Sequence, residues 1–256
     1  MRPIKTVLFS FIFTTAAFSA DQRILIPVFY NGPGAGAAWR SALVINNKMS
    51  QPFRSPGVTF GILCPIPEGC FADAIPAGQF GALVLSSAPG GLLLMAPAAE
   101  VEKLVLRLEI SAVPRNPIIL GGTAIPIVRE RDFRTSTITL PFVAMGGGIR
   151  ARVRIYDPDS SAGTQVRVSI RSWTSPTGDP LDTRVLTLQE TRVTGATMPI
   201  PTPGYAEFDV ANTFPAVAPL GFNFNIDIEP VTPGLRFWAF ATTTNAANEV
   251  TAIWPQ

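Results

Sequence analysis

Residues 24–29 read Ile-Leu-Ile-Pro-Val-Phe, residues 39–46 read Trp-Arg-Ser-Ala-Leu-Val-Ile-Asn, and a glycine-rich gap separates them. The same arrangement returns as Ile-Thr-Leu-Pro-Phe-Val at 138–143, three glycines at 146–148 and an alternating stretch at 149–157. We interpret the two occurrences as the opening hairpin of one unit that was duplicated. Their positions predict one domain of residues 21–130 and a second of residues 131–256.

The composition favours a protein made of strands. Apolar residues make up 47% of the 256 positions and charged residues 15%, which is enough apolar surface to exclude disorder. The 21 glycines and 25 prolines are typical of many short strands joined by turns. Only residues 98–103 have a helical character. We therefore predict an all-β fold of two tandem antiparallel β-sandwich domains with Ig-like or Greek-key connections.

The first 20 residues differ from the rest of the chain. Arg2 and Lys5 precede an uncharged, mostly apolar run at 6–18, and small residues follow at Ser19 and Ala20, as signal peptidase requires. The run is shorter than the ~20 residues that cross a membrane. We predict a signal peptide over 1–20 and a mature protein that is secreted, periplasmic or on the cell surface, without membrane insertion.

The net charge of the mature chain suggests no charged partner. Arg2 and Lys5 leave with the signal peptide, so 18 of the 20 basic residues remain beside 18 acidic ones. A chain near neutrality has no electrostatic reason to bind nucleic acid. The partners that we expect are therefore an unidentified protein or a cell-surface polymer.

The cysteines are Cys64 and Cys70, in the sequence Cys-Pro-Ile-Pro-Glu-Gly-Cys. In an oxidising compartment this pair predicts a disulfide across a rigid loop. A loop this short gains roughly 2.4 kcal/mol in the chain-entropy model, so the bond shapes a local loop. The chain has no histidine and no third cysteine, so we expect these residues to bind no metal.

Residues 149–155 and 166–171 alternate apolar with polar side chains, as half-buried strands do. Turn-forming residues at 157–163 separate them, so we predict two neighbouring strands that share one outer face. This face is a candidate ligand or partner face. Its basic residues are Arg150, Arg152, Arg154, Arg167 and Arg171.

Two further strands, near 205–210 and 222–229, carry acidic outer faces with Glu207, Asp209, Asp227 and Glu229. In one sheet with the arginine strands, these acids would form cross-strand ion pairs worth a few tenths of a kcal/mol each. In the opposite sheet, they would give the protein one basic and one acidic face. The sequence leaves both arrangements open.

Catalytic groups are scarce. Ser-His catalysis is excluded because the chain has no histidine, and neither Lys48 nor Lys103 lies in a Ser-x-x-Lys motif. Paired carboxylates on the acidic strands are the one hydrolytic alternative, a glycoside hydrolase, but ion pairing explains them better. Asp157 and Asp159 suit an ordinary turn as well as a calcium site. We expect no enzymatic activity and no cofactor.

Four tryptophans raise the alternative of a carbohydrate-binding module, because exposed aromatic rings stack on sugar faces. Trp39 and Trp238 begin apolar strands and are expected in a core. Trp173 precedes the turn sequence Thr-Ser-Pro-Thr-Gly-Asp-Pro at 174–180, so it is the tryptophan expected to be exposed as a ligand contact.

The two ends of the chain resemble a family. Pro27-Val28, the glycine-rich gap and Trp39-Arg40-Ser41 are similar to the start of uncharacterised secreted β-sandwich proteins of bacteria, some built as tandem units. Residues 234–242, Gly-Leu-Arg-Phe-Trp-Ala-Phe-Ala-Thr, look like the end of such a unit. The resemblance implies an exported Ig-like scaffold and transfers no functional residues. Our leading hypothesis is a non-enzymatic structural, adhesion or interaction module at or outside the bacterial surface.

Overall fold

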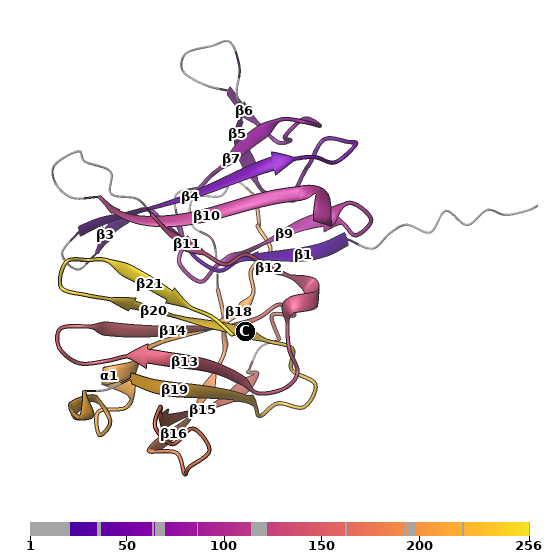
Figure 1. Cartoon of the computed structure of the whole chain (residues 1–256). Coiled ribbons are helices and arrows are strands. Elements are labelled where there is room, and N and C mark those ends of the chain that lie inside the picture. Colours follow the sequence, from indigo (N-terminus) through magenta and orange to yellow (C-terminus); the bar gives the residue numbers. More distant parts are fainter. Residues whose placement is uncertain are drawn as a thin grey trace, which may run out of the picture.

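The structure is a computed structural model that describes residues 21–34, 37–62, 64, 70–85, 87–113, 122–161, 163–191, 193, 198–221 and 223–255. The predicted signal peptide at 1–20 lies outside the described residues. The fold is all-β, as predicted, and every strand pair in it is antiparallel. Figure 1 shows strands throughout, with few and short helical turns.

The elements of residues 21–130 form the first part of the chain. They are β1 (Asp21–Ile26), β2 (Phe29–Tyr30), β3 (Gly32–Gly34), β4 (Ala37–Asn47), β5 (Thr59–Ile62), β6 (Cys70–Ala72), β7 (Phe80–Val84), β8 (Ser87–Ala88), β9 (Leu92–Pro97), η1 (Val101–Lys103), β10 (Leu104–Val113), β11 (Thr123–Ile125) and β12 (Val128–Arg129). The helical turn η1 falls within the stretch predicted to be helical.

The second part begins with the 3-10 turn η2 (Glu130–Asp132). Its remaining elements are β13 (Ile138–Ala144), β14 (Arg150–Asp157), β15 (Gln165–Ser172), β16 (Asp182–Thr187), β17 (Gln189–Glu190), β18 (Gly204–Asp209), α1 (Val210–Thr213), η3 (Ala218–Leu220), β19 (Asn223–Pro230), β20 (Trp238–Thr244) and β21 (Val250–Ile253). The alternating stretches predicted β14, β15, β18 and β19, with ends shifted by one or two residues.

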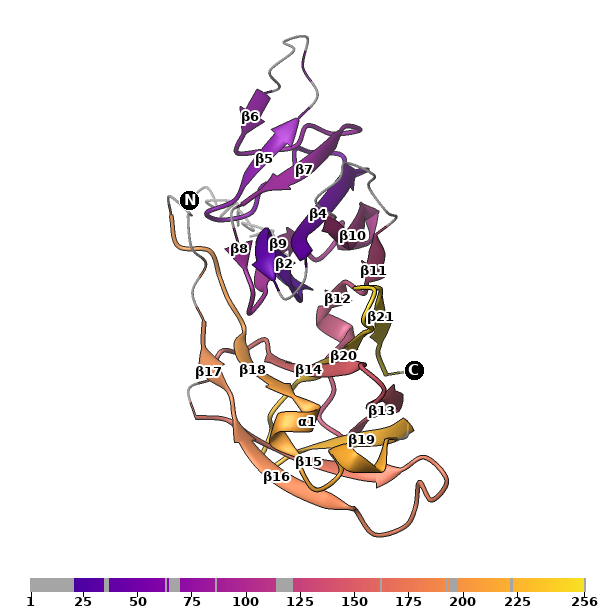
Figure 2. The same cartoon turned by 90° about the vertical axis from the view of Figure 1, so that its left-hand side faces the viewer.

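Four main sheets are stacked from one end of the molecule to the other. A seven-stranded sheet has the order β11-β10-β4-β7-β5-β6, with β3 beside β4, and it faces a three-stranded sheet of order β12-β1-β9. Below them lie a five-stranded sheet, β17-β18-β14-β20-β21, and a four-stranded sheet, β13-β19-β15-β16. In Figure 2 the five-stranded sheet crosses the middle of the molecule and the four-stranded sheet lies beneath it.

The three-stranded sheet is buried on both faces. Ile24, Leu25 and Ile26 of β1 are consecutive, so they point to alternate faces, yet each is fully buried. One face packs on the seven-stranded sheet, and the other lies toward the five-stranded sheet of the second part. This position explains why β9 (Leu92–Pro97) is an unbroken apolar run and why β1 ends in one at 24–26, whereas most other strands alternate.

Two hydrophobic clusters fill the spaces between the sheets. One lies between the five- and four-stranded sheets and contains residues of the second part alone. The other belongs mainly to residues 24–133 but also takes in Tyr156, Ile200, Trp238 and Phe240. The first part of the chain therefore completes its core with aromatic side chains that the second part supplies.

The two predicted opening hairpins are not hairpins. β1 pairs with β9 and β12, while β4 pairs with β10, β7 and β3 in another sheet. Likewise β13 pairs with β19, while β14 pairs with β18 and β20. In both places the chain crosses from one sheet to the sheet facing it. Both strands then point apolar side chains into the core between the two sheets. The two openings thus share a crossover instead of a hairpin.

Details of these crossovers follow the residue types. Pro141 lies on the edge strand β13, where the pairing with β19 shifts between Leu140 and Val143, and an edge or a bulge suits a residue that cannot donate a ladder hydrogen bond. Residues 32–34 of the first glycine-rich gap form β3, which pairs with β4, and Ala35 and Gly36 lie outside the described residues. The glycines at 146–148 all have positive φ, from 61° to 85°, and form a tight turn.

Candidate functional site

The predicted arginine face is divided between two sheets. β14 lies in the five-stranded sheet and β15 in the four-stranded sheet, so Arg150, Arg152 and Arg154 face away from Arg167 and Arg171. The prediction of one shared face was wrong because alternation shows that a strand has a buried face, but not whether two such strands are neighbours or face each other across a core.

Each group of arginines pairs with acids of its own sheet, which is the first of the two arrangements that the sequence left open. Arg152 and Arg154 lie 3.2 and 2.8 Å from the carboxylate of Glu207 on β18. On the other sheet, the acids of β19 pair with β15, Glu229 with Arg167 at 3.2 Å and Asp227 with Arg171 at 2.7 Å. The arginines therefore form no open basic surface. Arg150 is exposed and has no ion pair among the described residues.

Arg154 is the most buried of these arginines. Its guanidinium lies 5.6 Å from the centre of the Phe240 ring, and one terminal nitrogen donates to the hydroxyl of Thr242 at 3.1 Å. The hydroxyl of Tyr205 donates to the same Glu207 carboxylate at 2.6 Å. Burial, together with this carboxylate, raises the pKa of Tyr205, so the hydroxyl remains a donor at neutral pH.

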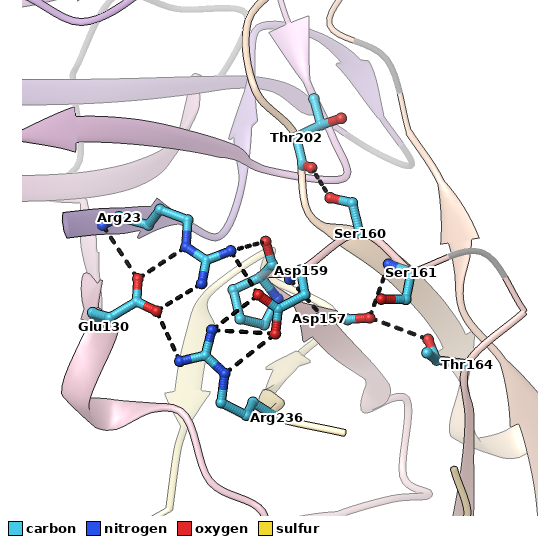
Figure 3. Close-up of polar contacts among 10 residues, drawn as sticks. Arg23, Glu130, Asp157, Asp159, Ser160, Ser161, Thr164, Thr202 and Arg236 are labelled. Atoms are coloured by element: carbon cyan, nitrogen blue, oxygen red, sulfur yellow. Dashed lines mark hydrogen bonds and ion pairs between the residues drawn. The ribbon is translucent and has the colours of Figure 1, made fainter. Parts of the chain in front are cut away.

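The remaining carboxylates also have structural partners. Asp209 accepts a hydrogen bond from the backbone nitrogen of Asn212 at 3.0 Å and so caps α1. Asp157 is buried, and its side chain accepts hydrogen bonds from the backbone of Asp159 and Ser161 at 2.8 and 3.2 Å (Figure 3). The loop after β14 is thus an Asp-Pro turn. Within the described ranges, no cluster of three acids, cysteines or histidines could hold a metal ion.

A closed ring of charges joins the two parts of the chain. Arg23 of β1 binds Glu130 with two nitrogens, at 2.9 and 2.7 Å, and binds Asp159 at 2.8 Å. Arg236, just before β20, completes the ring by binding Glu130 at 2.8 Å and Asp159 at 2.9 Å (Figure 3). Hydrogen bonds from the arginines lower the pKa of Glu130 and of Asp159. Both acids therefore stay ionised at neutral pH and hold the ring together.

We expect Glu130→Gln to lower the free energy of unfolding by about 1–2 kcal/mol at pH 7, because charged hydrogen bonds to two arginines are lost. A carboxylate whose pKa is lowered by folding contributes stability above its unfolded pKa, about 4, and loses it as the pH falls through the lower folded value. The difference between wild type and variant should therefore shrink below about pH 4. Urea denaturation at several pH values measures both effects.

The control for Glu130→Gln is Glu102→Gln. Glu102 pairs with Arg131 at 2.6 Å and more distantly with Arg129 at 3.7 Å, but the Glu102 side chain is more than half exposed, so these contacts should contribute at most about 1 kcal/mol. Equal losses in the two variants would show that the ring stabilises no more than an ordinary surface pair.

A buried tyrosine makes a second link between the two parts. Tyr156 of β14 is fully buried, and its hydroxyl donates to the carbonyl oxygen of Pro27, just after β1. Its ring lies beside those of Trp238 and Phe240, with centres 6.2 Å away in both cases. Burial raises the pKa of Tyr156 well above its ordinary value. The outer face of the five-stranded sheet is therefore an internal interface at this end.

The predictions of a buried Trp238 and an exposed Trp173 are confirmed. Trp238 is buried, whereas Trp173 is 46% exposed and lies beside an exposed Phe142, with ring centres 6.2 Å apart. Trp39, expected in a core, is only half-buried. Trp254 is 45% exposed and lines a pocket of about 290 Å³ next to Trp238. Residue types alone did not point to Phe142 as an exposed ring, because its exposure depends on the shift in register within β13.

The outer face of the seven-stranded sheet is a large apolar surface that sequence reasoning missed. One cross-strand row on it runs from Val44 through Ala82 and Gly61 to Phe71. The exposed apolar side chains of this face, which we call the upper apolar face, are Val44, Phe71, Phe80, Val84 and Val105, each 42–71% exposed. The signal was present in unbroken apolar runs such as 43–45 and 104–106, which leave no polar face on an antiparallel strand.

The disulfide between Cys64 and Cys70 is present, as predicted, with Cα atoms 5.9 Å apart. It lies next to the edge strand β6, although residues 65–69 of its loop lie outside the described residues. No helix in the described part of the chain is long and apolar enough to span a bilayer.

Searches with family models, against curated proteins and against solved structures found no match to this chain.

Proposed function

We propose that this chain is an exported, non-enzymatic protein of two Ig-like β-sandwich domains that acts as a structural and interaction module at or outside the bacterial cell surface. Two hydrophobic clusters support the pair of sandwiches, since one is centred on the first part of the chain and the other contains residues of the second part alone. The disulfide is compatible with an oxidising compartment. Most of the acids that hydrolysis would need are instead bonded to arginines or to the backbone.

The upper apolar face is the main support for a function in interaction with a partner. Its five large side chains expose on the order of 400 Å² of apolar surface, in the range of the largest patch on a typical monomer. The side chains come from β4, β6, β7 and β10 and follow one another across the sheet. An apolar surface of this kind is stabilised when a partner covers it.

The partner that we propose for this face is a second copy of the chain. Two copies of residues 21–256, with 18 basic and 18 acidic side chains each, carry no net charge and do not repel. The charges bordering the face include Arg107 and Glu109, 2.5 Å apart on β10, and the exposed Arg40 of β4. A two-fold axis between Arg107 and Glu109 would place this arginine of each copy opposite the other copy's glutamate. Two sheets can pack face to face in this way about 10 Å apart.

We expect Val105→Lys to make the protein monomeric, because a charge would be buried in the centre of the dimer. Sedimentation velocity of residues 21–256 over a range of concentrations gives the association state. The matched control is Val185→Lys on β16, since Val185 is 51% exposed and Val105 is 50% exposed. The control should remain dimeric. A monomeric wild type, or equal behaviour of the two variants, would overturn the dimer, and turnover of a cell-surface polymer would contradict a non-enzymatic function.

A further inference from the structure

The opposite end of the molecule carries a strained residue with an exposed ring. Phe142 has φ of 55°, a region that bulky residues rarely adopt, and it lies where the β13-β19 register shifts. Its neighbours Leu140 and Val143 are fully buried, whereas Phe142 is 59% exposed. Such strain costs about 1–3 kcal/mol and persists only where the surroundings enforce it. Here it holds a large apolar ring in water.

A second exposed ring lies beside the first. Trp173 follows β15 directly, and its ring is tilted by 47° to that of Phe142. Phe142 belongs to β13, and Trp173 directly follows β15 of the same four-stranded sheet, so the packing of the sheet fixes the separation of the two rings. Together they form an aromatic platform, by which we mean the exposed rings of Phe142 and Trp173.

Polar groups in fixed positions border the aromatic platform. Arg171 donates to Asp227 at 2.7 Å, and the hydroxyl of Thr139 donates to the other oxygen of the same carboxylate at 2.6 Å. The side-chain oxygen of Asn225 accepts from the backbone nitrogen of Phe142 at 3.3 Å. Because Asn225 lies opposite Arg171 in the sheet, all these groups share its outer face. They are held in place before any ligand arrives, which lowers the entropy cost of binding.

We propose that the aromatic platform and the polar groups beside it bind a neutral saccharide. A pyranose ring presents apolar C–H faces, which suit aromatic rings, and a rim of hydroxyls, which suit carboxylate, amide and guanidinium groups. The charges on this face are balanced, since Arg171 pairs with Asp227 and Arg167 pairs with Glu229. This balance favours an uncharged ligand over an anionic one. The proposal is independent of the dimer, which uses the opposite end of the molecule.

The test is binding of residues 21–256 to an array of neutral and acidic glycans, followed by titration with the best one. Trp173→Ala should weaken binding at least tenfold, because one of the two stacking rings is lost. The matched control is Trp254→Ala, which removes a tryptophan of equal exposure and should bind as the wild type does. Phe142→Gly should also weaken binding but without loss of thermal stability, since glycine adopts the positive φ freely.

Glycan binding by the wild type and by these variants shows whether the aromatic platform is a saccharide site. Binding of neutral glycans that Trp173→Ala and Phe142→Gly weaken, and that Trp254→Ala leaves unchanged, supports it. Absence of binding to any glycan, a preference for acidic glycans, or unchanged binding by Trp173→Ala overturns it. Val105→Lys should bind the glycan normally, so failure of the dimer and failure of the saccharide site can be told apart.

Discussion

Trp238→Ala is expected to lower the free energy of unfolding by about 3–5 kcal/mol, the largest single effect that we predict. Trp238 is 5% exposed and belongs to the second part of the chain, but it packs in the cluster of the first part. Its ring lies 5.4 Å from that of Phe240. Truncation therefore leaves a cavity in the interface between the parts, so the stability of both should fall together.

Urea denaturation followed by circular dichroism and by the fluorescence of the remaining tryptophans measures this effect. We expect both signals to change in one transition at a lower urea concentration. Trp254→Ala, which removes an exposed ring, should shift the midpoint far less. Two separate transitions, of which one stays in place, would show that the two parts unfold independently.

Gly57→Ala is expected to destabilise the protein by about 3 kcal/mol or more. Gly57 has φ of 73°, and a Cβ atom there would lie 2.6 Å from the carbonyl oxygen of Pro199. Because the obstacle is backbone, it cannot move aside as a flexible side chain can. The segment of Pro199 is itself held, since the next-but-one residue Pro201 accepts a hydrogen bond from the backbone nitrogen of Leu93 at 2.8 Å.

The chain offers a matched control for this substitution. Gly78 has φ of 75°, almost the same value, but nothing lies within 4 Å of a Cβ atom placed there. Gly78→Ala should cost only the strain of the left-handed conformation, about 1–2 kcal/mol. The difference between the two variants, measured by thermal or urea unfolding, isolates the contact with Pro199. Equal losses of stability in the two variants would mean that the backbone at Pro199 moves aside without lowering the free energy of unfolding.

Most of the strands could be predicted from sequence because their side chains alternate between a buried and an exposed face. In β10, Leu104 and Leu108 are buried and Val105 and Arg107 are exposed, as the two-residue period requires. The pairing of strands could not be predicted in this way. A strand beside β14 and a strand facing it across the core show the same pattern, and the arginines of β15 were therefore assigned to the wrong sheet.

The candidate sites were harder to predict than the strands. Trp173 was identified because a turn sequence follows it, but its neighbour Phe142 depends on a shift in register that residue types do not reveal. Tyr156 continues the exposed side of β14, yet it is buried because a sheet formed by the first part of the chain covers that end. Burial by a distant segment is a property of the assembled fold and leaves no local pattern in the sequence.

The doubly buried sheet also bears on how fast the protein can fold. Both partners of β1, β9 and β12, come much later in the chain. Two long loops must close before this sheet exists, and topologies rich in such distant pairings fold in milliseconds to seconds. β1 therefore cannot complete its native pairing until residues 128–129 are available.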